Sequence, residues 1–291
     1  MLPKSADLSK ALRQVGLEAG DMVYLSTQLY GIGPIAGLRT RDEYVSAVLS
    51  AFQNVIGERG TLVVPTFTQQ VGRYGLSFEL EQTISLTGIF GEYVRQMPSS
   101  VRSLHPIFSV SALGYLAKEL CADISPVAFG ADSIFDRMTK RNAKVVCMGF
   151  DYYSGHIVSL MHHVETMFAV PYYYNKLVTS RVFAKGNEVK QPFVINVKYL
   201  DLGCSFDYHR YIDALAANGC IRSAAFGRGE IHSVDASAMF DVGIALLKSD
   251  PYAFLAQLPH YEAGRIPCDG PPERLSDDEL QANWQGFYIG V

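Results

Sequence analysis

The chain has 291 residues, a length that suits one large domain or two smaller ones. Apolar residues make up 48% of the sequence and charged residues 19%, a balance typical of a globular enzyme with a sizeable core. The formal net charge of −4 argues against nucleic acid as the main partner, because binding it usually requires a basic face.

The cysteines and the apolar runs indicate the compartment. The cysteines are odd in number and widely spaced, which is not the pattern of a disulfide framework: Cys121, Cys147, Cys204, Cys220 and Cys268. The first ten residues contain no apolar signal-peptide core, and no apolar run approaches the ~18 residues that a membrane span needs. We therefore expect a cytoplasmic protein without a membrane span.

In chain order, the first part of the sequence predicts a parallel strand–helix–strand unit. Apolar spacing and turn residues predict a helix at 5–15, a strand at 22–26, a helix at 42–55 and a strand at 61–64. Thr40 and Glu43 form a capping box before the second helix. A strand, a helix and a strand in this order imply a right-handed parallel connection.

A loop that contains Gly31, Gly33 and Gly37 follows the first strand. It lies between the end of a strand and the start of a helix, where backbone N–H groups favour a phosphate. The loop has neither the GK[ST] of a Walker loop nor the GxGxxG spacing. From its residues alone, a plain turn is the more frequent explanation.

Further apolar patterns predict helices at 88–97, 115–122 and 134–138, and strands ending near Leu113 and at 143–148. Active-site residues of open α/β sheets gather just beyond the strand ends. The loops after Ser26, Val64 and Met148 therefore have the expected location of a site.

One short segment combines a basic side chain, two hydroxyls and an imidazole, as Arg102, Ser103, His105 and Ser109. A simpler explanation is that His105 only caps the turn before Pro106.

The stretch 155–170 predicts a helix packed on the core and stopped by Pro171. His162 and Glu165 lie three residues apart, hence on the same side of that helix. A carboxylate there can fix the tautomer of a neutral imidazole and stabilise its protonated form, as a general base requires. Alone, an HxxE pair is more often an ordinary pair on a helix surface than a catalytic one. His163 points about 100° away, so we expect it to be structural.

Beyond Pro171 the pattern becomes antiparallel. Two alternating runs, 178–184 and 189–199, predict a hairpin with its turn at Lys185-Gly-Asn187, and helices are expected at 207–217 and 236–248. The acidic stretch 273–285 after the linker-like run 267–272 is a candidate short helix that docks on the body or on a partner subunit.

These elements predict an α/β fold with a central mixed, largely parallel sheet flanked by helices. A smaller C-terminal portion would carry the antiparallel hairpin and helices. We expect one domain at 1–258, with its core at about 1–170 and the hairpin and helical portion at about 171–258, followed by a tail at 259–291.

Several segments together resemble the aminoglycoside 3-N-acetyltransferase family over about residues 8–258. The most specific are RSLHP with its following serine and the HxxE of His162 and Glu165, and GDMVYLSTQLYGIG, GTLVVPTFT and FGADSIFDRM also match. The resemblance implies transfer of an acetyl group from acetyl-CoA, or another acyl-CoA, to an amine on a sugar ring. No metal is implied, and no HExxH or paired CxxC offers further ligands.

The resemblance also implies roles for individual residues. His162 would deprotonate the attacking amine, directly or through one water, and Glu165 would orient it. Ser103, His105 and Ser109 would line the thioester and pantetheine pocket. The segment with Ser26, Thr27, Gly31, Gly33 and Gly37 would receive the phosphates of the cofactor. The candidates for acceptor binding are Thr66, Tyr152 and Tyr153, and those for oxyanion donors are backbone amides near Ser26–Thr27 or Gly149.

Departures from the family pattern bear on the acceptor. Leu25-Ser26-Thr27 lacks the histidine that usually precedes two serines, and Ala36-Gly37 replaces the usual glycine pair. Aminoglycosides are polycations that call for an acidic cleft, whereas 69–75 is neutral to basic and contains Arg73. The sequence thus favours a single amino-sugar, for example one carried on a nucleotide for surface-polysaccharide synthesis, with an aminoglycoside as the alternative.

Other mechanisms and classes remain as alternatives. Cys204 or Cys147 could carry the acyl group, although neither has an evident base beside it. A hydrolase could use the His162–Glu165 pair to activate water, and a non-catalytic sugar- or CoA-binding protein would tolerate the loss of His162. The sequence leaves a homodimer open.

Overall fold

The computed structural model describes residues 2–150, 158–264 and 267. The helices are α1 (Ser5–Gln14), α2 (Leu29–Ile32), α3 (Arg41–Ile56), α4 (Gln69–Tyr74), α5 (Ile89–Arg95), α6 (Ala117–Cys121), α7 (Ile134–Lys140), α8 (Val158–Phe168), α9 (His209–Ala217) and α10 (Ala236–Ser249). The strands are β1 (Met22–Thr27), β2 (Thr61–Pro65), β3 (Phe78–Glu79), β4 (Val101–Arg102), β5 (Val110–Gly114), β6 (Lys144–Met148), β7 (Tyr173–Val178), β8 (Val182–Ala184), β9 (Asn187–Glu188), β10 (Phe193–Lys198), β11 (Arg222–Phe226) and β12 (Gly229–Asp235).

The main sheet of the described chain has seven strands in the order β11-β12-β6-β1-β2-β5-β4. Pairing is parallel at its centre, where β1 lies between β6 and β2. The outer pairs are antiparallel. This confirms the predicted mixed α/β sheet and the parallel β1–α3–β2 unit.

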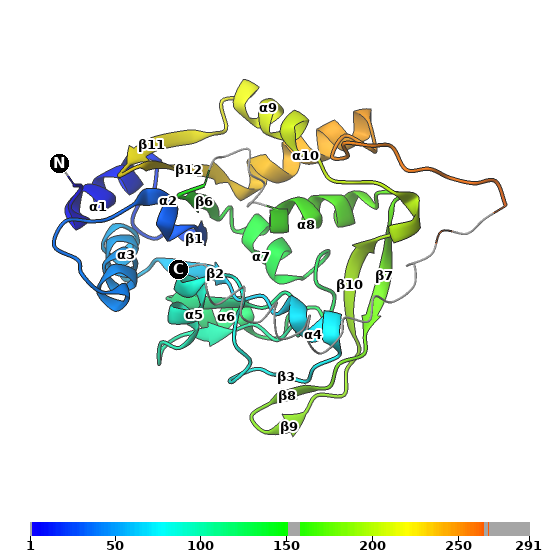
Figure 1. Cartoon of the computed structure of the whole chain (residues 1–291), viewed down its shortest axis with the longest axis horizontal. Coiled ribbons are helices and arrows are strands. Elements are labelled where there is room, and N and C mark those ends of the chain that lie inside the picture. The colour runs from blue at the N-terminus through cyan, green and yellow to red at the C-terminus, as the bar shows by residue number, and fades with distance from the viewer. Residues whose placement is uncertain (1, 151–157, 265–266, 268–291) are drawn as a thin grey trace.

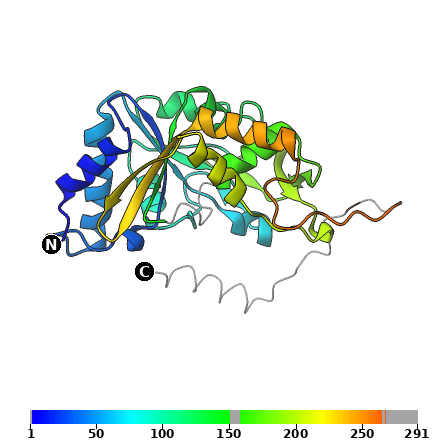
Figure 2. The ribbon, with the colours of Figure 1, turned by 90° about the horizontal axis from the view of Figure 1, so that it is seen from above.

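Alternate residues of the central strands face two different cores. Tyr24 on β1 and Cys147 on β6 face the core under α7, α8 and α10. Val23 and Val146 face the core under α1 and α3. Figure 2 shows α1 and α3 (blue) and α10 (orange) on opposite sides of the strands. The central strands are apolar throughout because both of their faces are covered.

The predicted hairpin 178–184/189–199 is wrong in its strand pairing. The turn at Lys185–Gly186 exists, but it joins only the short strands β8 and β9. Pro192 cannot donate a ladder hydrogen bond, and β3 takes the other edge of β8. The second run instead becomes β10, which pairs with β7, the strand of the tyrosine run (Figure 1).

Two further differences concern strand and helix ends. Residues 222–235 form the hairpin β11–β12, and β12 joins β6 in the main sheet, which the sequence did not predict. Helix α8 ends at Phe168, because Ala169 adopts a left-handed conformation with φ 61° before Pro171 is reached. Residues 155–157 of the predicted helix and the tail 268–291 lie outside the described residues.

Among the described residues, no helix is long and apolar enough to cross a membrane.

The capping box of α3 gives a direct stability prediction. The Thr40 Oγ1 atom accepts a hydrogen bond from the Glu43 backbone N–H at 3.2 Å, and Glu43 Oε2 accepts one from the Thr40 N–H at 3.1 Å. We expect Thr40→Ala to lower the free energy of unfolding by about 1 kcal/mol, because it leaves an N-terminal donor unpaired. The urea midpoint measures this loss. Thr40→Ser is the control, since serine keeps the accepting oxygen, and an equal loss in both variants would contradict the capping role.

Candidate active site

Helix α8 places His162 and Glu165 one turn apart, as the sequence predicted. His162 Nδ1 lies 2.8 Å from Glu165 Oε2. The Glu165 side chain is completely buried, whereas the His162 side chain is 18% exposed. The imidazole is thus accessible on one side and held against a buried carboxylate on the other.

Two consecutive tyrosines from the turn after α8 contact the same carboxylate. The Tyr172 hydroxyl donates to Glu165 Oε1 at 2.7 Å, and the Tyr173 hydroxyl donates to Oε2 at 2.7 Å. Burial, together with the charge of Glu165, raises the pKa of both phenols well above the ordinary value of 10. Both therefore stay protonated and act as donors. The sequence alone does not assign these tyrosines to the site, because only their pairing with Glu165 distinguishes them from core aromatics.

The contacts of Nδ1 fix the tautomer of His162. Nδ1 faces Glu165 Oε2, and the Tyr173 hydroxyl oxygen also lies 2.8 Å away. A lone pair on Nδ1 would face the anionic carboxylate, so Nδ1 carries the hydrogen and Nε2 keeps the basic lone pair. The rings of Phe129 and Phe206 lie at centroid distances of 5.5 and 5.2 Å from the imidazole and form an apolar surround.

The neighbouring His163 has a structural environment, as expected. Its side chain is fully buried, and its Nδ1 accepts a hydrogen bond from the Gly130 N–H at 3.2 Å. Burial lowers its pKa to about 4, so this imidazole is neutral in the working pH range.

The structure places Ser103, His105 and Ser109 inside the fold. His105 Nδ1 accepts from the Ile107 and Phe108 amides at 3.2 and 3.0 Å, which leaves the Nε2 hydrogen facing the Val194 carbonyl at 3.3 Å. Burial lowers the His105 pKa to about 4. These bonds match the turn-capping explanation.

Both serine hydroxyls are also engaged internally. Ser103 Oγ accepts from the Val110 N–H at 2.9 Å, and Ser109 Oγ donates to the Thr66 carbonyl at 2.8 Å. Thr66 is buried as well and bonds the Ser109 carbonyl through its hydroxyl. The three residues of the 103–109 segment build a wall of the fold, and their contact with a cofactor stays a prediction, as does that of Thr66 with an acceptor. Tyr152 and Tyr153 lie outside the described residues.

Arg102 fastens this wall to the segment that follows α4. Its guanidinium donates to the carbonyls of Leu80, Thr83 and Thr66 at 3.1, 2.6 and 2.9 Å. Burial lowers its pKa to about 9. The basic residue of the RSLHP segment is therefore anchored to backbone oxygens.

The candidate phosphate loop lies where the ends of β1 and β6 meet. Ser26 and Thr27 pair with Cys147 and Met148 across these strands. A Cβ atom on Gly31 would lie 1.9 Å from the Gly149 carbonyl oxygen, so only glycine fits there. Gly33, with φ 72°, ends α2, and its carbonyl accepts a hydrogen bond from Tyr44. Gly37, with φ 86°, turns the chain toward α3.

Three groups that the sequence offered as an oxyanion donor or an acyl carrier are engaged or unreactive. The Gly149 N–H donates to the Glu230 carbonyl at 3.0 Å, so it is not an open oxyanion donor. Burial raises the pKa of the Cys147 thiol to about 12 and also raises that of Cys204. Neither thiol is primed to carry an acyl group.

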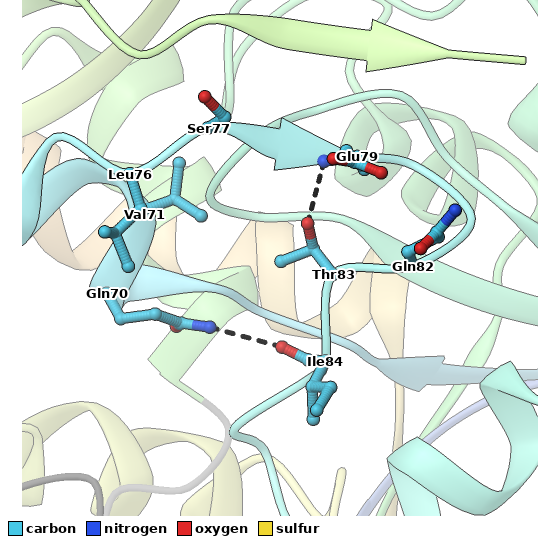
Figure 3. A pocket seen from close by; sticks show the side chains of 8 residues that line it. All are labelled: Gln70, Val71, Leu76, Ser77, Glu79, Gln82, Thr83 and Ile84. Carbon is cyan, nitrogen blue, oxygen red and sulfur yellow. Dashed lines mark hydrogen bonds between the residues drawn. The ribbon is translucent and has the colours of Figure 1, made fainter. Parts of the chain in front are cut away.

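A surface pocket of about 280 Å³ lies on the segment after α4 (Figure 3). Its lining residues are Gln70, Val71, Leu76, Ser77, Glu79, Gln82, Thr83 and Ile84. None of them belongs to the cluster around His162, so this pocket is not where the imidazole acts. Within the described ranges, no group of three or more His, Cys, Asp or Glu residues could hold a metal ion.

Comparisons with known proteins agree with this geometry. A family model described as aminoglycoside 3-N-acetyltransferase matches residues 26–248. Aminoglycoside N(3)-acetyltransferase VII of Streptomyces paromomycinus is 24% identical, and the match covers 83% of this chain and 90% of that enzyme. Aminoglycoside N(3)-acetyltransferase IX of Micromonospora chalcea is 26% identical over 54% of this chain and 59% of that enzyme.

Solved structures share the fold. A binary complex of AAC-IIIb with CoASH superposes with a TM-score of 0.73 at 19% identity, covering 89% of this chain and 100% of that one. AAC-VIa bound to sisomicin superposes with a TM-score of 0.70 at 19% identity, covering 86% of this chain and 98% of that one. The model match spans β1 to α10, including the His162–Glu165 pair. As its sequence motifs predicted, the chain belongs to the aminoglycoside 3-N-acetyltransferase family and thereby to the acyl-CoA-dependent N-acyltransferases.

Proposed function

We propose that this protein transfers an acetyl group from acetyl-CoA to an amine of an aminoglycoside, with His162 as the general base. The observation that carries the proposal is the His162–Glu165 pair itself. Glu165 Oε2 lies 2.8 Å from His162 Nδ1 and fixes the hydrogen on that nitrogen. The basic Nε2 is then left on a partly exposed ring. Such a base is needed because a protonated amine is not a nucleophile.

The chain's own residues account for the proton and its position. Nε2 of His162 takes the proton from the acceptor amine, directly or through one water. Glu165 stabilises the imidazolium that results, across the 2.8 Å contact with Nδ1. Acetyl-CoA supplies the activated acetyl group as a thioester, so no protein nucleophile is required. The high pKa of the Cys147 thiol agrees with direct transfer.

The loop at the ends of β1 and β6 fits the phosphates of this co-substrate. Gly31 and Gly33 bring the backbone close to its neighbours where a Cβ atom would intrude. The neighbour of Gly33 is the Arg228 side chain, and its guanidinium places a positive charge beside this loop that suits phosphate oxygens. Ser26 and Thr27 add hydroxyls at the same strand end. We therefore assign the cofactor phosphates to the segment from Ser26 to Gly37.

The relatives support an aminoglycoside acceptor over the nucleotide-linked amino-sugar that the sequence favoured. The curated relatives are named as aminoglycoside acetyltransferases, and a related structure holds sisomicin.

The general base gives the first functional prediction. We expect His162→Ala to lower kcat/KM for the acceptor by about 100-fold or more while acetyl-CoA still binds, because proton removal is lost and the cofactor loop is untouched. Release of free thiol from acetyl-CoA measures turnover, and calorimetry measures cofactor binding.

The matched control is His209→Ala, since His209 is an exposed histidine whose side chain is 64% accessible. Retention of wild-type turnover by His162→Ala would remove this histidine from the mechanism, whereas cofactor binding without thiol release in the wild type would favour a non-catalytic binding protein.

The acceptor is tested with a panel. We expect thiol release with aminoglycosides that carry a 3-amino group, and at least 10-fold slower release with nucleotide-linked amino-sugars. An aminoglycoside already acetylated at this amine serves as the matched control, and mass spectrometry locates the new amide. The reverse order of rates would restore the nucleotide-sugar hypothesis. Thiol release without any acceptor amine would identify a thioesterase, which is the hydrolase alternative.

A further inference from the structure

We infer that Tyr172 and Tyr173 are positioning residues that stabilise the charged carboxylate of Glu165 behind His162. They do so by donating one hydrogen bond to each oxygen of the Glu165 carboxylate. This inference deepens the proposed function, because it rests on His162 acting as the base and adds how the pair is tuned.

The first step is the burial of Glu165. Its side chain is completely inaccessible, and within the described residues no lysine or arginine forms an ion pair with it. A carboxylate without such compensation would bind a proton, because burial disfavours its charged form. The two phenols, each at 2.7 Å, supply the hydrogen bonds that water would otherwise give.

The second step concerns every titratable group that faces the pair. Helix α8 contributes His162 and Glu165 themselves, and the turn after it contributes Tyr172 and Tyr173. The 204–208 segment contributes the Cys204 thiol and the Tyr208 phenol, whose pKa values are raised partly by the charge of Glu165. From β10, the Lys198 ammonium lies 4.1 Å from the centre of the Phe206 ring, which itself packs on His162.

Besides His162, only Tyr172 and Tyr173 among these groups donate a hydrogen bond to the carboxylate. The hydroxyl of Tyr208 is buried and makes no hydrogen bond to any described residue. Lys198 donates instead to the Cys204 carbonyl at 2.8 Å. Tyr172 and Tyr173 are therefore the neutral donors that stabilise the charge of Glu165.

The third step is the effect on proton affinity. His162 and Glu165 are coupled at 2.8 Å, so one added proton belongs to the pair rather than to either residue. Hydrogen bonds donated to the carboxylate stabilise its charge and reduce its attraction for a proton, on itself or on the imidazole. Removal of either donor would therefore increase the attraction of the pair for a proton.

The chain geometry is built to hold both phenols in place. Ala169 has a left-handed backbone with φ 61°, which is rare for a residue with a side chain. The Val170 N–H then donates to the Glu165 carbonyl at 3.2 Å, so the chain turns back over the last turn of α8. This turn brings Tyr172 and Tyr173 onto the two oxygens of the carboxylate seven and eight residues earlier in the chain.

The test is the pH dependence of Tyr172→Phe and Tyr173→Phe. Each variant removes one donor and keeps the ring, so the proton affinity of the pair must rise whichever residue holds the proton. We expect the acid limb of the kcat/KM profile for the acceptor to move up by about one pH unit or more, with KM for acetyl-CoA unchanged. The same upward shift is expected in the titration of the His162 imidazole followed by NMR without substrates.

Tyr252→Phe is the matched control. Its ring packs 6.2 Å from that of Tyr172, but Tyr252 makes no hydrogen bond to Glu165. This variant should keep the wild-type acid limb and the wild-type His162 titration.

The outcomes separate this inference from the proposed function. If both phenylalanine variants fold, shown by an unchanged far-ultraviolet circular dichroism spectrum and a cooperative urea transition, and keep the wild-type acid limb and titration, the inference is wrong. The dependence on His162 would then still stand. Should one variant fail to fold, the other and its NMR titration decide. Wild-type activity of His162→Ala would instead overturn the proposed function, whatever the tyrosine variants show.

Discussion

The structure around the candidate active site depends on one constraint, the charge of a carboxylate placed where water cannot reach it. Glu165 is fully buried, so its carboxylate oxygens depend on hydrogen bonds donated by the protein. His162 and two phenols meet that demand. The same contacts orient the imidazole, because Nδ1 has to present its hydrogen to Glu165. A single buried charge thus fixes the orientation of the proposed base.

The sheet provides the second part of the site. Its parallel centre brings the ends of β1 and β6 together, and the loop with Gly31 packs against Gly149 at that place. Helix α8 follows β6 in the sequence and packs over the same sheet (Figure 1). Strand β6 therefore ends beside the proposed phosphate loop and leads in the sequence to the helix that carries His162.

The side chains of the RSLHP segment are engaged in holding the fold. Arg102 binds three carbonyl oxygens, and His105 closes a turn with two backbone amides. Burial lowers the pKa of His105 to about 4, so this imidazole is neutral and a weak base, whereas Arg102, with a pKa of about 9, stays charged near neutral pH. These contacts hold the segment that carries Phe108. The Phe108 ring packs on Phe129, and the Phe129 ring packs on the imidazole of His162.

Local patterns in the sequence determined the features that short stretches of chain encode. The apolar runs specified the central strands, the Thr40–Glu43 spacing specified the start of α3, and the HxxE spacing placed His162 beside Glu165. The tertiary structure alone decided that β10 pairs with the tyrosine strand β7 and that β12 joins the main sheet, because these pairings depend on strands 15 or more residues apart that compete for the same edges. It also decided the role of Tyr172 and Tyr173. An aromatic pair reads the same in a core or in a site, and only the fold brought a buried carboxylate to their hydroxyls.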